Sequence, residues 1–444
     1  MAESPDNSSS SNPGSPEKGV KLLSPIVDVR PSELVPMLVS ALWIFLAITA
    51  YYIIKPIRGQ VLQELIGVDN KPIALISTTI FIGFFAYGYG KIVGRVERKP
   101  LVLWTYAAFL ACVGAFAVAL PNAGRITGYV FFVWVSTFSV MIVSQFWAVA
   151  ADVWTKDEGA RLFGFIGLGT VSGGIAGTAL TKLAKQLPTW QMLLVSAGIL
   201  TVCLLLSLYI LAFGARKPEA VAEVSQEKAA EKPPEVNAIS MVLGSPYLRL
   251  IAAMTLVLNL VNSNNEWILD KMFSTQGGGD SRTFYADFYF WQNLLAALIQ
   301  FLLTGRIQRR FGARVALLFL PLVGALGGSA FLLVPTLAVI RALKIAENAT
   351  DYSIQSNTRE FLYLPTTKIE KYAAKNVNDT FVVRIGDLLA AGSIEVAKIV
   401  LSYLPGSGLR VLVAADVVLA IVWIAIVLRI GVVNAKLMEQ RAKA

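Results

Sequence analysis

Long apolar stretches separated by short polar segments dominate this chain of 444 residues. Twelve of the stretches reach about the 20 residues that a helix needs to cross the hydrocarbon core of a bilayer. The alternating pattern of barrel strands is absent from them, and lipid tolerates only backbone whose polar groups are bonded internally. The sequence therefore predicts an all-α membrane protein with twelve transmembrane helices. The predicted spans are residues 34–54, 72–92, 101–120, 127–151, 162–183, 190–214, 247–269, 284–304, 314–334, 335–356, 378–400 and 408–430.

Polar segments divide these spans into two groups of six. Residues 1–33 are rich in Ser, Pro and Asn, which predicts a disordered cytoplasmic tail and not a cleavable signal peptide. The acids Glu3, Asp6 and Glu17 argue against the alternative of a plastid transit peptide. Residues 215–246 read as a solvated cytoplasmic linker and residues 431–444 as a second cytoplasmic tail. We therefore expect two six-helix bundles, at 34–214 and 247–430.

One basic motif occurs after the second span and again after the eighth. Residues 94–99 and residues 305–310 share the pattern Gly-Arg-aliphatic-x-Arg-basic. Ordinary loop charge accounts for the basic residues, but not for the same pattern six helices later. The motif indicates an internal duplication and resembles the loop between the second and third helices of major facilitator transporters. That resemblance implies parallel halves, a substrate site between them near mid-bilayer, and alternating access.

Composition agrees with a membrane assignment, since 55% of the residues are hydrophobic and only 15% are charged. With both termini cytoplasmic, most of the 39 Lys and Arg residues fall on the cytoplasmic side. The positive-inside rule therefore explains the net charge of +10, and nucleic acid is not expected as a partner. Cys112 and Cys203 lie within spans, and histidine is absent from the sequence. We expect no metal, no cofactor and no enzymatic activity.

Charge inside the spans is the best indication of function, because an ionised side chain at mid-bilayer costs about 2.5–3.5 kcal/mol. Span one ends with Lys55, Pro56 and Arg58. Snorkelling of the two cations to the interface is one interpretation. The other is an anion-binding mouth, because adjacent cations on this side violate the charge bias. In that case Pro56 is expected to break the helix and to leave backbone groups facing a cavity.

Three further spans carry polar or charged stripes. In span seven, Asn262, Glu266 and Asp270 are four residues apart and share a face, which favours a lumen-facing stripe over a plain helix end. In spans ten and eleven, opposite charges lie one turn apart. They either neutralise each other or bind phosphate and gate the path. The residues of these two spans are Arg341, Lys344, Glu347 and Asp351, then Arg384, Asp387, Glu395 and Lys398, and Asp152 of span four is a further candidate.

Small and aromatic residues have simpler interpretations. Glycines recur every three or four positions in residues 164–177, which predicts close helix packing. A nucleotide-binding loop is not supported there, because no strand precedes the glycines and the Lys-Ser/Thr ending is missing. Most aromatic residues of spans four and eight are expected in the core or the interfacial belt. One or two of them are candidates for stacking on a base.

Several segments together resemble the ATP/ADP translocase family of intracellular bacteria and plastids. The most specific similarity is the Tyr-Ser-Ile segment at 352–354 and the exit loop at 357–365, which ends in Leu-Tyr-Leu-Pro. Gly59 and Ser356 stand where family members often have an acid. The other matching segments are residues 55–58, 245–247, 259–261, 266–267 and 371–386.

This resemblance implies ATP:ADP exchange, or uptake of another nucleotide, by a monomer in the bacterial inner membrane. Cations would neutralise phosphates, and acids would gate the path or couple protons. The alternatives are a major-facilitator carrier of another organic anion or drug, and a membrane scaffold. The expected substrate-binding residues are Lys55, Arg58, Asn262, Glu266, Arg341, Lys344 and Arg384. The expected gating or coupling residues are Asp152, Glu347, Asp351, Asp387, Glu395 and Lys398.

Overall fold

The computed structural model describes residues 28–93, 95–216, 238–403 and 408–443, and every regular element in these ranges is helical. The first six helices are α1 (Pro31–Val61), α2 (Lys71–Val93), α3 (Arg98–Ala119), α4 (Arg125–Val153), α5 (Lys156–Leu183) and α6 (Thr189–Gly214). The later helices are α8 (Ala238–Gly244), α9 (Pro246–Gln276), α10 (Ser281–Ile299), α11 (Gly305–Leu333), α12 (Leu337–Thr350), α13 (Ser356–Phe361), α14 (Lys368–Asn376), α15 (Val383–Tyr403) and α16 (Gly408–Lys443). Short π-helical turns at Leu62–Ile66, Gln300–Thr304, Asp351–Gln355 and Val377–Val382 continue some of them.

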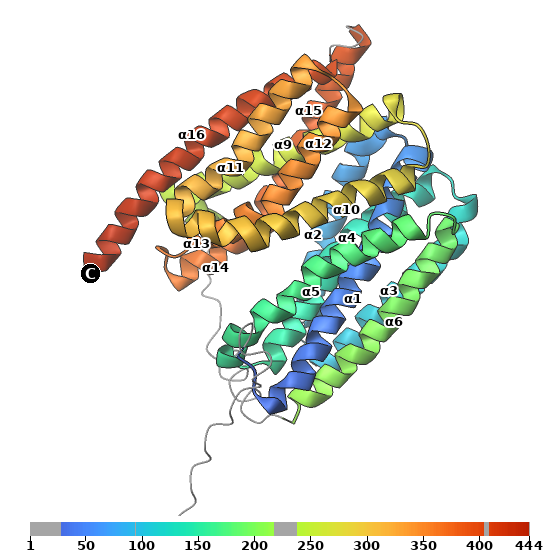
Figure 1. The fold of residues 1–444 in the computed structure, drawn as a ribbon, viewed down its shortest axis with the longest axis vertical. Coiled ribbons are helices and arrows are strands. Elements are labelled where there is room, and N and C mark those ends of the chain that lie inside the picture. Colours follow the sequence, from blue (N-terminus) through green and yellow to red (C-terminus); the bar gives the residue numbers. More distant parts are fainter. Residues whose placement is uncertain (1–27, 94, 217–237, 404–407, 444) are drawn as a thin grey trace, which may run out of the picture.

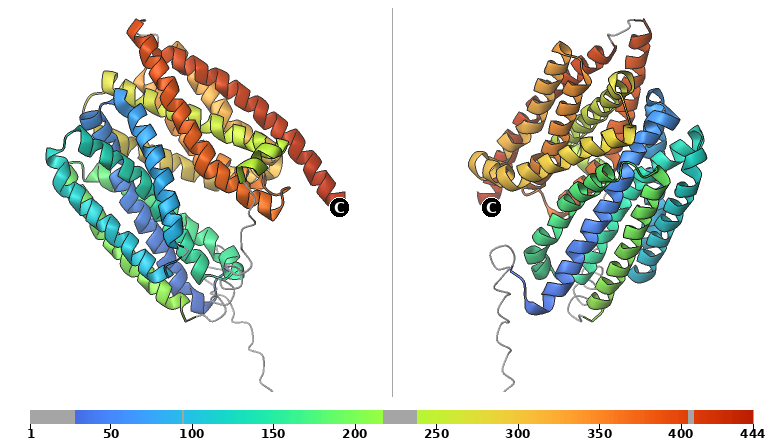
Figure 2. Two further views of the ribbon diagram at one scale, coloured as in Figure 1. Left: turned by 180° about the vertical axis from the view of Figure 1, so that it is seen from behind. Right: turned by 45° about the vertical axis from the view of Figure 1, so that its right-hand side comes forward.

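The helices form two bundles, drawn in blue to green and in yellow to red in Figure 1. In the first bundle, α1 packs against α4, α5 and α6; in the second, α9 packs against α12, α15 and α16. Between the bundles, α1 and α5 contact α10, and α2 runs beside α15 (Figure 2). The bundles converge at one end and diverge toward the end where α1 begins and α16 ends (Figure 1). We call the converging end the distal end.

The distribution of charge decides which described helices are apolar enough to cross a membrane. Eight pass by length and composition, and the pair α8 and α9, bent by 104°, would make a ninth. They include all six spans predicted before the linker. The predicted spans at 247–269, 314–334, 335–356 and 378–400 are helical but are not among the eight. Three of these four carry the predicted charged or polar stripes, so the twelve-span count stays a prediction.

Some predicted boundaries were wrong. Helix α1 continues past Pro56 to Val61, and a π-helical turn extends it to Ile66. Pro56 therefore does not break the helix: proline removes one backbone hydrogen bond, a loss that helices packed within a membrane protein tolerate. As a result Lys55 and Arg58 lie inside the helix, not at its end.

The predicted tails and linker are only partly described. The tail predicted at 1–33 and the linker predicted at 215–246 lie mostly outside the described residues. Within the described part, α1 already begins at Pro31, and α8 occupies the end of the linker range. Residues 431–443, predicted as a tail, continue α16 as helix.

The glycines of α5 let it pack directly on the backbone of α1, as predicted. A Cβ added at Gly173 would lie 2.4 Å from the carbonyl oxygen of Phe45, and one at Gly177 would lie 2.5 Å from that of Thr49. Gly169 meets Ala41 in the same way, at 2.6 Å. The three glycines occur every fourth residue and therefore form one stripe along the helix. The stripe fixes α1, which carries Lys55 and Arg58, against its neighbour.

We expect Gly173→Ala to lower the thermal stability of the purified protein, because the methyl group would press on the α1 backbone. Overpacking of this kind costs about 1–3 kcal/mol. Gly167→Ala is the matched control, since no atom lies within 4 Å of a Cβ there. Thermal unfolding in detergent measures both variants. Equal melting temperatures for the two would contradict the packing role.

Candidate functional site

Lys55 of α1 is a buried cation at the place where the first bundle meets α10. Its side chain is only 7% exposed. Among the described residues the ammonium has no ion pair and no hydrogen bond. Its neighbours are the rings of Tyr289, Tyr52 and Tyr51, whose centroids lie 4.2, 5.1 and 5.7 Å from Nζ. Aromatic faces attract a cation but do not neutralise it, so an anion bound beside Lys55 would be stabilised.

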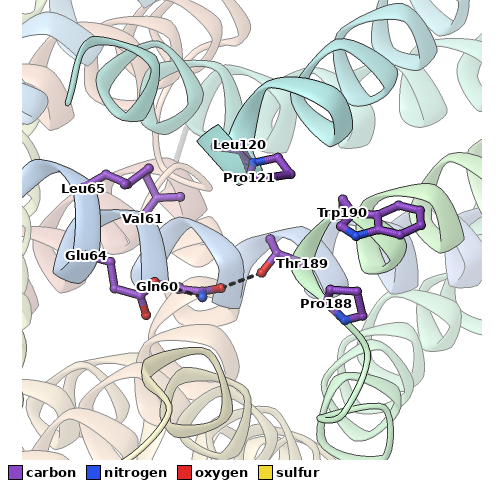
Figure 3. Close-up of a pocket in the computed structure, with 9 residues that line it drawn as sticks. All are labelled: Gln60, Val61, Glu64, Leu65, Leu120, Pro121, Pro188, Thr189 and Trp190. Carbon is purple, nitrogen blue, oxygen red and sulfur yellow. Dashed lines mark hydrogen bonds between the residues drawn. The ribbon is translucent and has the colours of Figure 1, made fainter. Parts of the chain in front are cut away.

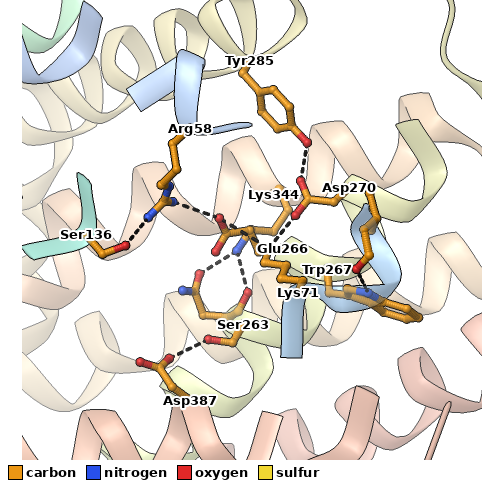
Figure 4. Close-up of polar contacts among 12 residues, drawn as sticks. Arg58, Lys71, Ser136, Ser263, Glu266, Trp267, Asp270, Tyr285, Lys344 and Asp387 are labelled. Carbon is orange, nitrogen blue, oxygen red and sulfur yellow. Dashed lines mark hydrogen bonds and ion pairs between the residues drawn. The ribbon is translucent and has the colours of Figure 1, made fainter. Parts of the chain in front are cut away.

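Glu266 of α9 lies between cations of the first bundle, as Figure 4 shows. One carboxylate oxygen is 3.5 Å from Arg58 of α1 and 3.7 Å from Lys71 of α2. Glu266 also interacts electrostatically with Lys344 and Lys55. Arg58 in addition donates a hydrogen bond of 3.2 Å to Ser136 of α4. The acid that the sequence placed on a polar stripe therefore joins the two bundles.

Lys71 and Asp270 form a second pair across the interface, one turn further toward the distal end. Their charged atoms are 2.5 Å apart, and both side chains are almost completely buried. Tyr285 donates to the other oxygen of Asp270 at 2.5 Å, and Gln63 donates to the Asp270 carbonyl at 3.0 Å. Removing one partner would leave an uncompensated buried charge, so this pair holds the distal ends of the bundles together.

Gly59 explains how α1 and α10 come so close at this point. A Cβ at Gly59 would lie 2.3 Å from the ring of Tyr285. An acidic side chain here, as in many members of the resembled family, would displace that ring. The glycine therefore makes room for the tyrosine that contacts Asp270.

Lys344 of α12 faces the same region from within the second bundle. Its ammonium donates to the side chain of Asn262 at 2.6 Å and lies 3.4 Å from Glu347, one turn along the helix. Asn265 donates to the other oxygen of Glu347 at 2.9 Å. The structure therefore brings Lys344, Asn262 and Glu347 together. Lys344 interacts electrostatically with Glu266, which also interacts with Lys55 and Arg58.

The remaining predicted cations have acidic partners. Arg341 pairs with Asp287 of α10, which also binds Lys182 of α5 at 2.5 Å, so this triad again joins the bundles. Arg384 pairs with Asp387 at 3.0 Å, and Ser263 donates to the same acid at 2.9 Å.

The remaining gating candidates lie away from Lys55. Asp152 pairs with Arg98 of α3 within the first bundle. Lys398 pairs with Glu395 at 2.7 Å and donates to the backbone oxygen of Asp69, which links α15 to the turn before α2. Asp351 lies in the turn after α12 and lines a small cavity with Asn262, Glu347 and Trp423.

Sequence reasoning missed four charged residues of this region: Lys71, Lys182, Asp287 and Asp416. Lys71 stands at the start of the second span, on the side where cations are otherwise sparse, and that violation of the charge bias was the available signal. Asp416 is an acid inside a very apolar span. An ionisable residue in such a span is costly, and that was the signal that could have identified it.

A pocket of about 310 Å³ lies at the distal end of the first bundle (Figure 3). Its lining includes Gln60 and Glu64 of the α1 end, Pro121, and Thr189 and Trp190 of α6. Glu64 is the one charged residue of the lining, which has no cation. The pocket is therefore unsuited to an anion.

A helical membrane protein whose two bundles meet across a buried, charged interface belongs to the class of secondary transporters. This chain belongs to the Major Facilitator Superfamily, which it matches over residues 40–346. Solved transporters share the fold. A bacterial homologue of the iron transporter ferroportin, in an inward-facing state, superposes with a TM-score of 0.63 at 12% identity, covering 89% of this chain and 98% of that one. A bacterial homologue of the human lysosomal transporter Spinster, inward-facing and unoccupied, gives 0.61 at 15% identity, with 92% and 99% coverage.

Sequence relatives confirm the resemblance to nucleotide carriers. The ADP,ATP carrier protein 1 of Chlamydia trachomatis is 24% identical over 293 residues, which cover 56% of this chain and 54% of the carrier. The protein of the same name from Chlamydia muridarum is 23% identical over 293 residues, with the same coverage. The similarity therefore spans about half the length of these relatives.

We expect Asp270→Asn to loosen the distal end, because Lys71 would lose the nearer and more deeply buried of its two acids. Breaking such a pair costs about 3–5 kcal/mol. Spin labels on cysteines introduced at Asn122 and Gly278, with Cys112 and Cys203 changed to alanine, report the distance between the bundles at this end. Pulsed electron resonance should detect an added population at longer distance.

Asp280→Asn is the control for this measurement. Asp280 is an exposed acid at the same end that caps α10, and asparagine caps helices equally well. An unchanged distance distribution in Asp270→Asn would show that the Lys71 pair does not hold the bundles together.

Proposed function

We propose that the protein is a secondary transporter that moves nucleotides by alternating access, with ATP:ADP exchange as its reaction. The observation that carries the proposal is Lys55, a buried cation at the meeting of the two bundles that has no acidic partner among the described residues. The similarity to ADP,ATP carriers supports a phosphate-bearing anion as the substrate. Twelve spans in two six-helix halves, in a bacterial inner membrane with cytoplasmic termini, complete the proposed topology.

In this proposal the substrate phosphates bind first at Lys55 and then recruit Arg58 and Lys344. The charge balance supports this assignment: Lys55, Arg58, Lys71 and Lys344 face Glu266, Asp270 and Glu347, so four cations oppose three acids. Asn262 and Glu266 complete the site, since each contacts one of these cations. Arg341 and Arg384 are held by their own acids, so we place them at its margin.

Competition for Arg58 would couple binding to movement. Glu266 belongs to the second bundle and Arg58 to the first, so their ion pair is one of the contacts that close the distal end. A phosphate that takes Arg58 would displace Glu266 and weaken that closure. Lys71, Asp270 and the Asp287 triad would then part as the bundles rock. The hydrogen bond from Lys398 to the turn before α2 would break at the same time, whereas Lys398 would keep its pair with Glu395 on α15.

The other gating candidates have smaller parts in this scheme. Asp152 would brace the first bundle through Arg98, and Asp387 would hold Arg384 back from the path. Glu347 and Asp351 would line the route beside Asn262. We expect a monomer to suffice, because both bundles of the proposed site come from one chain.

A second candidate function is transport of another organic anion. The environment of Lys55 favours it to the extent that a single ammonium attracts any anion and does not distinguish a nucleotide base. The two functions differ in whether unlabelled ADP competes for uptake better than a simple dicarboxylate does.

We expect Lys55→Met to reduce uptake of labelled ATP by proteoliposomes preloaded with ADP. A hydrogen bond to a charged group contributes about 1.5–3 kcal/mol, which corresponds to about a 10- to 100-fold loss in kcat/KM. Lys55→Arg should retain part of the activity, and Lys185→Met, at an exposed lysine, should retain all of it. Full transport by Lys55→Met would show that Lys55 does not bind the substrate. Failure of the unaltered protein to carry any nucleotide would favour the second candidate function.

A further inference from the structure

Asp416 of α16 is a buried acid in the second bundle that the proposed transport cycle does not use. Its side chain is 3% exposed. One carboxyl oxygen accepts a 2.8 Å hydrogen bond from Asn264 of α9, whose own oxygen accepts from Ser393 of α15 at 2.7 Å. The other oxygen, Oδ2, is buried and has no hydrogen-bond partner among the described residues.

The surroundings of Asp416 contain too little positive charge. It interacts electrostatically with Glu347, a second acid, and with Lys344, and it forms no ion pair within the described chain. Lys344 is engaged by Glu347 and Asn262. The groups that face Asp416 from α9 and α15 are the uncharged Asn264 and Ser393.

The remaining neighbour, α11, brings no closer charge. Its Arg314 packs beside Gly431, which is 15 residues from Asp416 along α16 and therefore about 22 Å away. Glu347 is much nearer, because its carboxylate and Ala420, one turn from Asp416, both lie beside Gly324. Asp351 lies beside Glu347 and interacts with it, with Lys344 and with Arg359, so among the described residues three carboxyls share Lys344.

We propose that Asp416 binds an exchangeable proton, so that the second bundle contains a proton-binding site separate from the anion site. Burying an ionised carboxylate without a cation costs several kcal/mol, and such a group becomes neutral instead. A proton on Oδ2 would make Asp416 neutral and leave Glu347 paired with Lys344. Asn264 still donates to Oδ1 in that state, so the observed hydrogen bond is retained.

The proton site is linked to the anion site through Lys344, and this part of the inference rests on the proposed function. When a phosphate draws Lys344 away from Glu347, Glu347 and Asp416 lose the cation that interacts with both of them. Each then binds a proton more tightly, so anion and proton binding strengthen each other reciprocally. The protein would therefore accumulate its anion with protons in addition to exchanging it.

Infrared spectroscopy of the purified protein tests the proton site without any nucleotide. At neutral pH the unaltered protein should show a carbonyl stretching band of a protonated carboxyl that Asp416→Asn lacks. Asp379→Asn, the same change at an exposed acid of the second bundle, should keep the band. An identical band in Asp416→Asn would show that Asp416 is ionised and would overturn the proposal.

Uptake driven by a pH gradient tests the linkage. Proteoliposomes free of internal nucleotide, acidic outside, should take up labelled ATP severalfold faster than without the gradient. Asp416→Asn should lose this acceleration but keep exchange with preloaded ADP, and undiminished acceleration would refute the linkage. If the unaltered protein carries no nucleotide in either assay, the proposed substrate is wrong, and the infrared result still decides the proton site.

Discussion

Pairing of buried charge across the interface between the bundles is the constraint on which the rest of this structure depends. Glu266 and Asp270 of the second bundle find their cations, Arg58 and Lys71, in the first. Neither pair can form within one bundle, and Asp270, which is almost completely buried, cannot stay ionised without its partner. The relative position of the bundles is therefore set by electrostatics at the distal end, while apolar packing sets the shape of each bundle.

Close approach of backbones makes this pairing geometrically feasible. The α5 glycines fix α1 within the first bundle, and Gly59 lets α10 approach α1 until Tyr285 reaches Asp270. These glycines thus position the proposed site indirectly, because any shift of α1 would move Lys55 and Arg58 together. The ion pairs and the contact of α10 with Gly59 must separate and re-form if the bundles rock, whereas the α5 glycines keep α1 in place within the first bundle.

Lys55 and Asp416 are buried charged groups that have no ion pair among the described residues, and they lie in different places. Lys55, at the interface, has only aromatic rings around it, whereas Asp416, inside the second bundle, has an amide and a second acid. An anion and a proton are the species that would complete them. Lys344 lies between the two groups, so a carrier built in this way can make the binding of one depend on the other.

The sequence by itself determined that the chain is helical, embedded in a membrane and similar to nucleotide carriers, because apolar length, charge bias and local motifs are properties of contiguous residues. It also named Lys55, Arg58 and Glu266 as charges that need an explanation. Only the tertiary structure decided which charges meet: Arg58 with Glu266, Arg341 with Asp287, and Lys71, overlooked in the sequence, with Asp270. The residues that form these contacts are 54 to 208 positions apart, and periodicity along one helix carries no information about the partner that another helix presents. Spacing therefore predicted the stripes, whereas packing decided that Lys55 would stay unpaired.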